Sequence, residues 1–200
     1  LKYLSRDGQS LSPIILVDDE SKKVFLQKFN PNDFYYQKYI NGECYYLLYY
    51  FHRNEEVLKF SQLNLIQQPD GKSMVAAVSS KFHETNESVK YELLFKKMKF
   101  HGLVMIEVKQ ENIDNFMIEA NPRFWGPSQL FVDAGMNLFD GFLHDYGFIE
   151  FFPQLQYKQN LTKYFWFGGI IEVLKMKKNL SFHKGNIINL MLDLPEWLKY

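Results

Sequence analysis

Two glutamates in neighbouring apolar segments have the spacing of a divalent-metal site. Glu107 lies inside segment 103–109, which is apolar on both faces like a fully covered strand, and Glu119 lies inside segment 116–120. If the two segments pair as a hairpin around the turn at 110–115, Glu107 falls within about one residue of the register opposite Glu119. Side chains in such positions lie about 5 Å apart, and like charges there destabilise a sheet. A divalent cation between the two carboxylates would remove that conflict.

Asn121 and Arg123 extend this candidate site beyond Glu119. Asn121 stands two residues further along the strand, on the same face, and adds a neutral oxygen. Two carboxylates and an amide oxygen form a hard set that suits Mg²⁺ or Mn²⁺. Arg123 adds a forked phosphate donor, and it is one of three arginines beside 20 lysines. In the alternative, structural interpretation, the first glutamate pairs with a lysine such as Lys109, the second is exposed, and the Asn-Pro-Arg run is a turn.

The same residues resemble the metal-binding end of the ATP-grasp superfamily, specifically its carboxylate-amine ligase branch. The resemblance rests on Glu107, on the run Glu-Ala-Asn-Pro-Arg-Phe-Trp-Gly at 119–126 and on the Ala-Gly pair at 134–135. In that branch a hydrophobic-Glu-hydrophobic-Lys strand precedes a Glu-x-Asn-Pro-Arg-aromatic-Trp-Gly-Ser run by about a dozen residues, and the two glutamates here stand 12 residues apart. Pro127, which precedes Ser128, is a departure from that pattern.

A second match lies upstream, in the order that the family requires. The run Tyr-Gln-Lys-Tyr-Ile-Asn-Gly-Glu at 36–43 is similar to the hinge strand whose peptide groups hold adenine. The resemblance implies nucleotide binding by five residues of this run. They are Gln37, Lys38, Tyr39, Ile40 and Glu43.

The start of the chain resembles the small subdomain of the same family. Lys2 is similar to its nucleotide-phosphate lysine, and the loop at 5–10 is similar to the loop that closes over phosphates. Three departures affect nucleotide or substrate contacts. They are Tyr3 where proline is usual, Cys44 where a ribose-binding glutamate is often found, and Gln67 or Gln68 in place of an arginine.

The resemblance implies an ATP-dependent carboxylate-amine, or carboxylate-thiol, ligase that works through an acyl phosphate. Glu107, Glu119 and Asn121 would hold Mg²⁺ (or Mn²⁺), while Arg123 and Lys2 would be catalytic and balance the charge on the transferred phosphoryl group. ATP and small-molecule carboxylate and amine substrates are the expected ligands. The alternative is a catalytically impaired ATP-grasp remnant that serves as a nucleotide-binding or structural module. A glycosidase-like acid/base pair of the two glutamates would leave Asn121 and Arg123 unexplained.

Composition excludes several other classes of protein. The 200 residues carry 23 Lys plus Arg and 23 Asp plus Glu, so the formal net charge is zero and argues against nucleic-acid or membrane-surface partners. The single cysteine, Cys44, favours a reducing, cytoplasmic location. No apolar run approaches the roughly 18 residues that cross a bilayer. The sequence is compatible with a homodimer.

Turn signals and periodicity define the elements that must position these residues. An apolar strand is expected at 13–17, followed by a helix from an N-cap at Ser21 to residue 29. Three antiparallel strands are expected between 34 and 65, with Asn-Gly at 41–42 as a hairpin turn. A further strand is expected at 74–78. Further helices are expected at 85–99, 128–134, 138–145 and 165–177.

Strands with helices at irregular intervals favour an α+β fold over a doubly wound parallel sheet. The resemblance implies ATP-grasp-type antiparallel sheets with flanking helices, built as a small nucleotide-clamping subdomain and a larger metal-binding subdomain. We expect part of the small subdomain at 1–40, the large subdomain at 41–148 and a truncated C-terminal extension at 149–200. Because the chain opens on leucine rather than methionine, we expect a fragment that lacks an N-terminal region.

Overall fold

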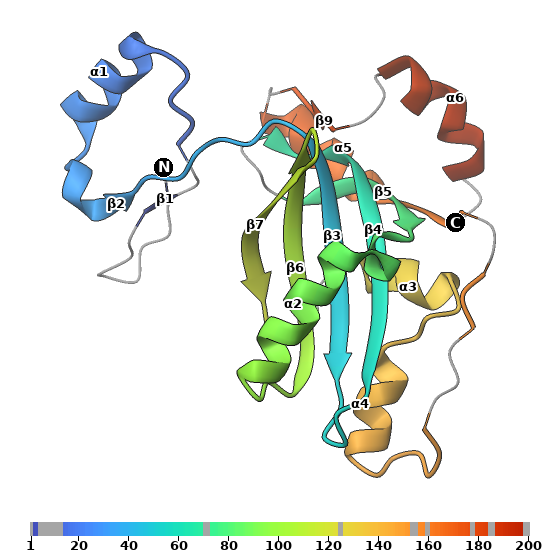
Figure 1. Ribbon diagram of the computed structural model, residues 1–200. Helices are drawn as coiled ribbons and strands as arrows, with labels where there is room; N and C mark the ends of the chain where they lie inside the picture. Colours follow the sequence, from blue (N-terminus) through green and yellow to red (C-terminus); the bar gives the residue numbers. More distant parts are fainter. Residues whose placement is uncertain are drawn as a thin grey trace.

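The computed structural model consists of a small N-terminal unit and a larger sheet flanked by helices (Figure 1). It describes residues 2–3, 14–69, 73–123, 126–152, 156–158, 161–176, 179–183 and 187–197. Within these ranges, no helix combines the length and the apolar character needed to cross a lipid bilayer. The α+β class predicted from the sequence is confirmed.

The N-terminal unit is a two-stranded sheet beside one helix. β1 (Lys2–Tyr3) pairs antiparallel with β2 (Phe34–Tyr35). Between them in sequence lie α1 (Asp19–Lys28) and a 3₁₀ turn at Pro31–Asp33. The ring of Phe25, on α1, packs edge-on against the ring of Phe34 with centroids 5.0 Å apart, which attaches the helix to β2.

α1 begins with a capping box at Asp18. The Asp18 Oδ1 accepts a hydrogen bond from the Ser21 backbone N–H at 2.7 Å, and the Ser21 Oγ accepts one from the Asp18 N–H at 3.1 Å. The predicted N-cap at Ser21 is therefore wrong, because Ser21 is the third helical residue and reciprocates the cap. The predicted strand at 13–17 is also wrong within its described part, because residues 14–17 pair with no strand and precede the helix directly.

The larger unit is built on a seven-stranded sheet in which every pairing is antiparallel. Its order is β7-β6-β3-β4-β5-β8, and β9 pairs with β4. The strands are β3 (Glu43–Phe51), β4 (Val57–Gln67), β5 (Met74–Ser80), β6 (Gly102–Glu111), β7 (Asp114–Asn121), β8 (Lys163–Phe165) and β9 (Ser181–Phe182). β3 is central, and residues 46–51 are all buried because helices cover both faces.

Alternate residues of each strand enter different cores. α2 (Asn86–Lys97) covers the face onto which the odd-numbered residues 47, 49 and 51 of β3 project. α3 (Gln129–Asp133) and α4 (Phe139–Asp145) cover the opposite face, where residues 44, 46, 48 and 50 project. Figure 1 shows α2 on one side of the sheet and these two helices on the other. The even-numbered face of β3 is the one that continues into the candidate site.

The C-terminal segment joins the same sheet. β8 extends the β5 edge, β9 pairs with the end of β4, and α5 (Phe167–Met176) and α6 (Ile187–Trp197) complete the described chain. Phe165 and Phe182 pack with Ile66 and Val75 in a third core. The helices predicted at 85–99, 128–134, 138–145 and 165–177 are all present with slightly different ends. The division at residues 40 and 148 stays a prediction.

An irregular linker at 36–42 carries the chain from the N-terminal unit to β3 (Figure 1). The predicted Asn-Gly hairpin turn is wrong, because β2 pairs with β1 and β3 pairs with β4 and β6. Gly42 has a different role. A Cβ atom at this position would lie 1.9 Å from the Gln110 carbonyl oxygen, so only glycine allows the linker to approach β6 this closely.

Candidate functional site

A cleft of about 510 Å³ lies between the N-terminal unit and the sheet. The N-terminal unit contributes mainly apolar side chains, and the sheet contributes carboxylates and an ammonium group. The lining consists of residues 14–16, Lys22, Phe25, Leu26, the linker residues 36–40, Gln67, Glu107, Lys109, Ile118 and Glu119. Four of the predicted nucleotide-binding residues, those at 37–40, therefore border the same cavity as two of the predicted metal ligands.

Glu107 and Glu119 face each other across β6 and β7. They are direct register partners, which confirms the hairpin pairing predicted from their spacing. Glu107 is 8% exposed and Glu119 is half-buried, so the structural interpretation in which Glu119 is exposed does not hold. The next partners are Val108 and Met117, so Ile118 is the additional residue of a β-bulge and borders the cleft as well.

Asn121 contacts Glu119 directly. Its Nδ2 donates a hydrogen bond to Glu119 Oε1 at 2.7 Å. The amide oxygen of Asn121 therefore remains able to bind a metal ion beside the carboxylate. Two carboxylates and one amide make an all-oxygen set, and this chemistry fits Mg²⁺, which takes few protein ligands and keeps waters or phosphate oxygens. In the described part of the chain, no group of three or more His, Cys, Asp and Glu side chains is placed to hold a metal ion. The fit therefore depends on Asn121 as the third ligand.

A row of buried polar side chains leads across the sheet to Glu107. Gln62 Nε2 donates to Asn64 Oδ1 at 2.7 Å, Asn64 Nδ2 donates to Cys44 Sγ at 3.2 Å, and the Cys44 thiol donates to Glu107 Oε1 at 3.6 Å. Burial raises the pKa of the Cys44 thiol, and the negative charge of Glu107 raises it further. The sulfur therefore keeps its proton and orients the carboxylate. Cys44 is thus a buried hydrogen-bond donor to Glu107 rather than a nucleophile.

Gln67 borders the cleft and contacts His183, which does not belong to the cleft lining. Their side chains are joined by a hydrogen bond of 2.7 Å between His183 Nε2 and Gln67 Oε1. Burial lowers the pKa of His183 to about 4, and the positive charge of Lys109 lowers it as well. A neutral imidazole must therefore carry its proton on Nε2 to donate to the Gln67 oxygen.

Two other predicted residues, Glu43 and Arg123, do not line the cleft. Glu43 accepts a hydrogen bond from the Tyr45 hydroxyl at 2.6 Å and borders a separate pocket of about 410 Å³. Arg123 is exposed, and its backbone N–H donates to the Asn121 carbonyl at 2.9 Å. Lys2 lies in β1 opposite Tyr35, one residue before the linker. The predicted phosphate-closing loop at 5–10 and the aromatic pair at 124–125 lie outside the described residues.

Two residues of β6 were missed as candidates. Lys109 borders the cleft two residues after Glu107, and Glu111, two residues further, contacts the linker. The alternation of side chains along a strand could have found both, since residues 107, 109 and 111 share one face. Phe25 of α1 also borders the cleft, and no local pattern indicated which face of that short helix would do so.

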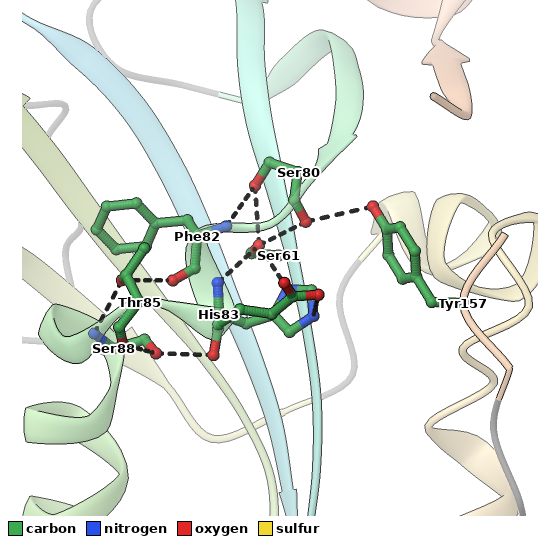
Figure 2. A network of polar contacts seen from close by, with 8 residues as sticks. Ser61, Ser80, Phe82, His83, Thr85, Ser88 and Tyr157 are labelled. Atoms are coloured by element: carbon green, nitrogen blue, oxygen red, sulfur yellow. Dashed lines mark hydrogen bonds and ion pairs between the residues drawn. The ribbon is translucent and has the colours of Figure 1, made fainter. Parts of the chain in front are cut away.

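A second polar cluster joins the middle of β4, the end of β5 and the start of α2 (Figure 2). Ser61 Oγ donates to the Ser80 carbonyl at 2.9 Å, accepts from the His83 backbone N–H at 3.1 Å and lies 2.8 Å from His83 Nδ1. Ser88 Oγ donates to the His83 carbonyl at 2.8 Å, and the Tyr157 hydroxyl donates to the Ser80 carbonyl at 3.3 Å. Because the Ser61 proton is directed at a carbonyl and Ser61 is fully buried, this Ser-His contact is structural rather than nucleophilic.

Comparisons with known proteins bear on the fold. No family model matches the chain, and no curated protein matches it. Among solved structures, a biotin carboxylase–beta-gamma-ATP complex from Campylobacter jejuni matches with a TM-score of 0.51 and 13% identity, over 64% of this chain and 30% of that chain. An N5-carboxyaminoimidazole synthetase from Staphylococcus aureus complexed with ADP matches with a TM-score of 0.44 and 16% identity, over 54% of this chain and 30% of that chain.

The chain thus spans about 30% of the length of either neighbour, and identity at this level concerns architecture alone. The described elements form antiparallel sheets with helices on both faces of the larger one. Over 64% of its length the chain shares the α+β fold of the biotin carboxylase, and the predicted antiparallel sheets with flanking helices are confirmed.

Proposed function

We propose that the cleft binds ATP together with Mg²⁺, and that the protein is an ATP-dependent ligase that joins a carboxylate to an amine or a thiol through an acyl phosphate. The observation that carries the proposal is the shared cavity, in which linker residues 37–40 and the pair Glu107 and Glu119 lie around one space. Its volume of about 510 Å³ lies within the range of small-molecule sites. The biotin carboxylase with the same fold was solved as a beta-gamma-ATP complex, which supports placing a nucleotide here.

The linker is the proposed site for the adenine base. Peptide N–H and C=O groups can pair with the edge of a purine whatever side chains they carry, so the backbone of residues 37–40 is suited to this role. The exposed apolar side chains of Ile15 and Leu26 border the same cavity and offer surfaces for the faces of the base. The base would therefore lie at the side of the cleft formed by the N-terminal unit.

The sheet is the proposed site for the phosphates. Glu107, Glu119 and Asn121 would hold Mg²⁺, which supplies positive charge to phosphate oxygens when it is bound. Lys109 borders the cleft and adds a fixed positive charge of the protein near the same place. Arg123 and Lys2 are proposed to balance the charge of the transferred group, as the sequence resemblance implies.

The proposed reaction has two steps and needs no protein nucleophile. An oxygen of the substrate carboxylate attacks the γ-phosphorus, the bond to the β,γ-bridging oxygen breaks, and ADP leaves. The amine nitrogen or thiol sulfur then attacks the acyl carbon, loses its proton and displaces phosphate. The chain's own residues position the reactants and exclude water, which is the main contribution of proteins to phosphoryl transfer.

Titration calorimetry with ATP tests the binding half of the proposal. We expect wild-type protein to bind ATP, and we expect Mg²⁺ to tighten that binding through Glu107 and Glu119. An absence of ATP binding, with and without Mg²⁺, would contradict the proposal. ADP release in the presence of mixtures of carboxylates and amines tests the catalytic half.

A second candidate is a nucleotide-binding module without catalysis. The positions of Glu43 and Arg123 favour it, because neither residue borders the cleft. In this case ATP binds with the same dependence on Mg²⁺, but no carboxylate and amine mixture releases ADP. The two candidates differ in that single measurement.

A further inference from the structure

The carboxylate of Glu111 joins the linker to the sheet by two hydrogen bonds. Its Oε2 accepts from Lys38 Nζ at 3.1 Å, and its Oε1 accepts from the Asn41 backbone N–H at 3.2 Å. Each oxygen therefore holds a different point of the linker. The hydrogen bond from Lys38, followed by that from the Asn41 peptide group, lowers the pKa of Glu111, so the carboxylate stays charged at neutral pH.

Two further contacts hold the linker against the same hairpin. The Lys38 ammonium lies 5.4 Å from the centroid of the Phe116 ring on β7, within the range of a cation–π interaction. Gly42 lies so close to the Gln110 carbonyl that no side chain fits between them. The peptide groups of 38–41 are thus fixed from both ends, at Lys38 and at Gly42, with Glu111 in contact with both parts.

We propose that Glu111 is a positioning residue for the nucleotide base: through Lys38 and Asn41 it fixes the peptide groups of the linker at 38–40 in the place where they meet the base. This inference rests on the proposed function, since it assumes that ATP binds in the cleft. If these donors and acceptors are already held in place, the linker loses less conformational entropy when the ligand binds. Loss of Glu111 would leave the contacts available but mobile.

The position of Glu111 along β6 separates its effect from that of the metal ligands. It stands four residues after Glu107 on the same strand, which corresponds to about 13 Å at the usual rise of a strand. A carboxylate that far away cannot share a cation with Glu107 and Glu119. Its removal should therefore weaken the binding of the base without changing how much Mg²⁺ tightens ATP binding.

Calorimetry on Glu111→Ala and Glu111→Gln, with and without Mg²⁺, tests this inference. In Glu111→Ala we expect the Kd of ATP to rise about tenfold in both conditions, because both hydrogen bonds to the linker are lost. Glu111→Gln keeps an oxygen that can accept from the Asn41 N–H but loses the charge that pairs with Lys38, so we expect a rise of about threefold. The ratio of the Kd values without and with Mg²⁺ should match that of the wild type in both variants.

Glu87→Ala is the matched control. Glu87 accepts from Lys90 Nζ at 2.6 Å on the surface of α2, in an ion pair whose lysine is as exposed as Lys38. We expect this variant to bind ATP as the wild type does. If it weakens ATP binding as much as Glu111→Ala, the inference is overturned, because any loss of a surface ion pair would then suffice.

Three other results overturn the inference. The first is a Kd for Glu111→Ala within about twofold of the wild-type value, a change too small for a role in preorganisation. The second is a loss of the Mg²⁺ effect in Glu111→Ala, which would assign the residue to the phosphate end of the cleft. The third is equal weakening by alanine and glutamine, which would exclude the contact with Asn41. If the wild-type protein binds no ATP at all, the proposed function fails and this inference fails with it, which is a different outcome from an unaffected variant.

Discussion

The polar groups of the two clusters in the sheet have different kinds of partner. Around Ser61 and His83, hydroxyl, imidazole and backbone groups alternate as donors and acceptors, and the cluster is closed by Ser88 and Tyr157. Around Glu107 and Glu119, two acceptors of like charge oppose each other at the border of a cavity. The first cluster is enclosed by the protein, whereas the second borders a space that a ligand can enter.

This contrast separates a structural use of buried polar groups from the proposed functional one. A closed network stabilises the fold only, because each donor already has an acceptor. An acidic pair beside a cavity reduces stability by repulsion, and that cost is removed when a cation binds. Variants in the two clusters should therefore affect different measurements, and the predictions below follow from that difference.

Glu119→Gln should have the largest effect. The substitution keeps the shape of the side chain but removes one of the two charges that would hold Mg²⁺, so we expect Mg²⁺-dependent ATP hydrolysis or ligation to be abolished. Assays of ADP release measure this, with circular dichroism as a control for folding. Unchanged turnover would contradict the assignment of Glu119 as a metal ligand. It would also contradict the proposed functional role that distinguishes the acidic pair from the Ser61 cluster.

The stability of the protein should fall in acid because of His183. Its folded pKa of about 4 lies below the ordinary value of 6.5, so the unfolded chain takes up the proton first as the pH falls. The free energy of unfolding is therefore unaffected by His183 above pH 6.5 and decreases as the pH falls towards 4. At about 1.4 kcal/mol per pKa unit, the decrease is at most about 3 kcal/mol. Urea unfolding between pH 7 and pH 4 measures this, and His183→Gln should flatten the curve. An equally steep curve in the variant would assign the loss to other groups, such as His83, whose pKa is also lowered by burial.

Ser61→Ala should reduce stability and leave ATP binding intact. The substitution removes the hydroxyl that links Ser80 to His83 and leaves buried polar groups without a partner, a loss of about 1–3 kcal/mol. Urea unfolding measures the first effect and calorimetry with ATP and Mg²⁺ measures the second. A variant that is fully stable but binds ATP poorly would show that this cluster also serves the cleft.

Cys44→Ser should have the smallest effect. A hydroxyl replaces the thiol as donor to Glu107, and loss of an outer partner of a metal ligand costs about 10- to 100-fold in affinity when nothing replaces it. Since serine retains the donor, we expect the Mg²⁺ enhancement of ATP binding to change by less than about tenfold. Cys44→Ala, which lacks any donor, should weaken the enhancement more than serine does. The reverse order would mean that the thiol does not orient Glu107.

The local sequence pattern was sufficient to predict most of the strands and helices of the larger unit. The apolar segments around Glu107 and Glu119 predicted a hairpin whose register was right to within about one residue, because side-chain alternation and a short turn determine that pairing within the segment itself. The helix at 85–99 was predicted from its apolar spacing, whereas α6 (Ile187–Trp197) was not predicted. The chemistry of the acidic pair followed directly from the register.

The N-terminal region could not be predicted in this way. Asn-Gly at 41–42 is a strong hairpin signal, but Gly42 is needed for a close approach to Gln110, about 70 residues away in sequence, and no local rule encodes that contact. The Lys38–Glu111 pair also depends on tertiary contact. The apolar run at 14–17 was assigned to a strand by composition, whereas residues 14–16 line the cleft.

The order of strands in the sheet also has a kinetic consequence. β3 and β4 are joined by the few residues between Phe51 and Val57, whereas the pairing of β3 with β6 brings together Glu43 and Gln110. The chain loses conformational entropy when it closes a loop of that length, and the stabilising contacts form only afterwards. Sheets of this kind therefore fold more slowly than sheets made of local hairpins. We therefore expect the β3–β4 and β6–β7 hairpins to form first and the β3–β6 seam to limit the rate. The acidic pair would then exist before the central strand closes beside it, and Mg²⁺ present during refolding should speed this step.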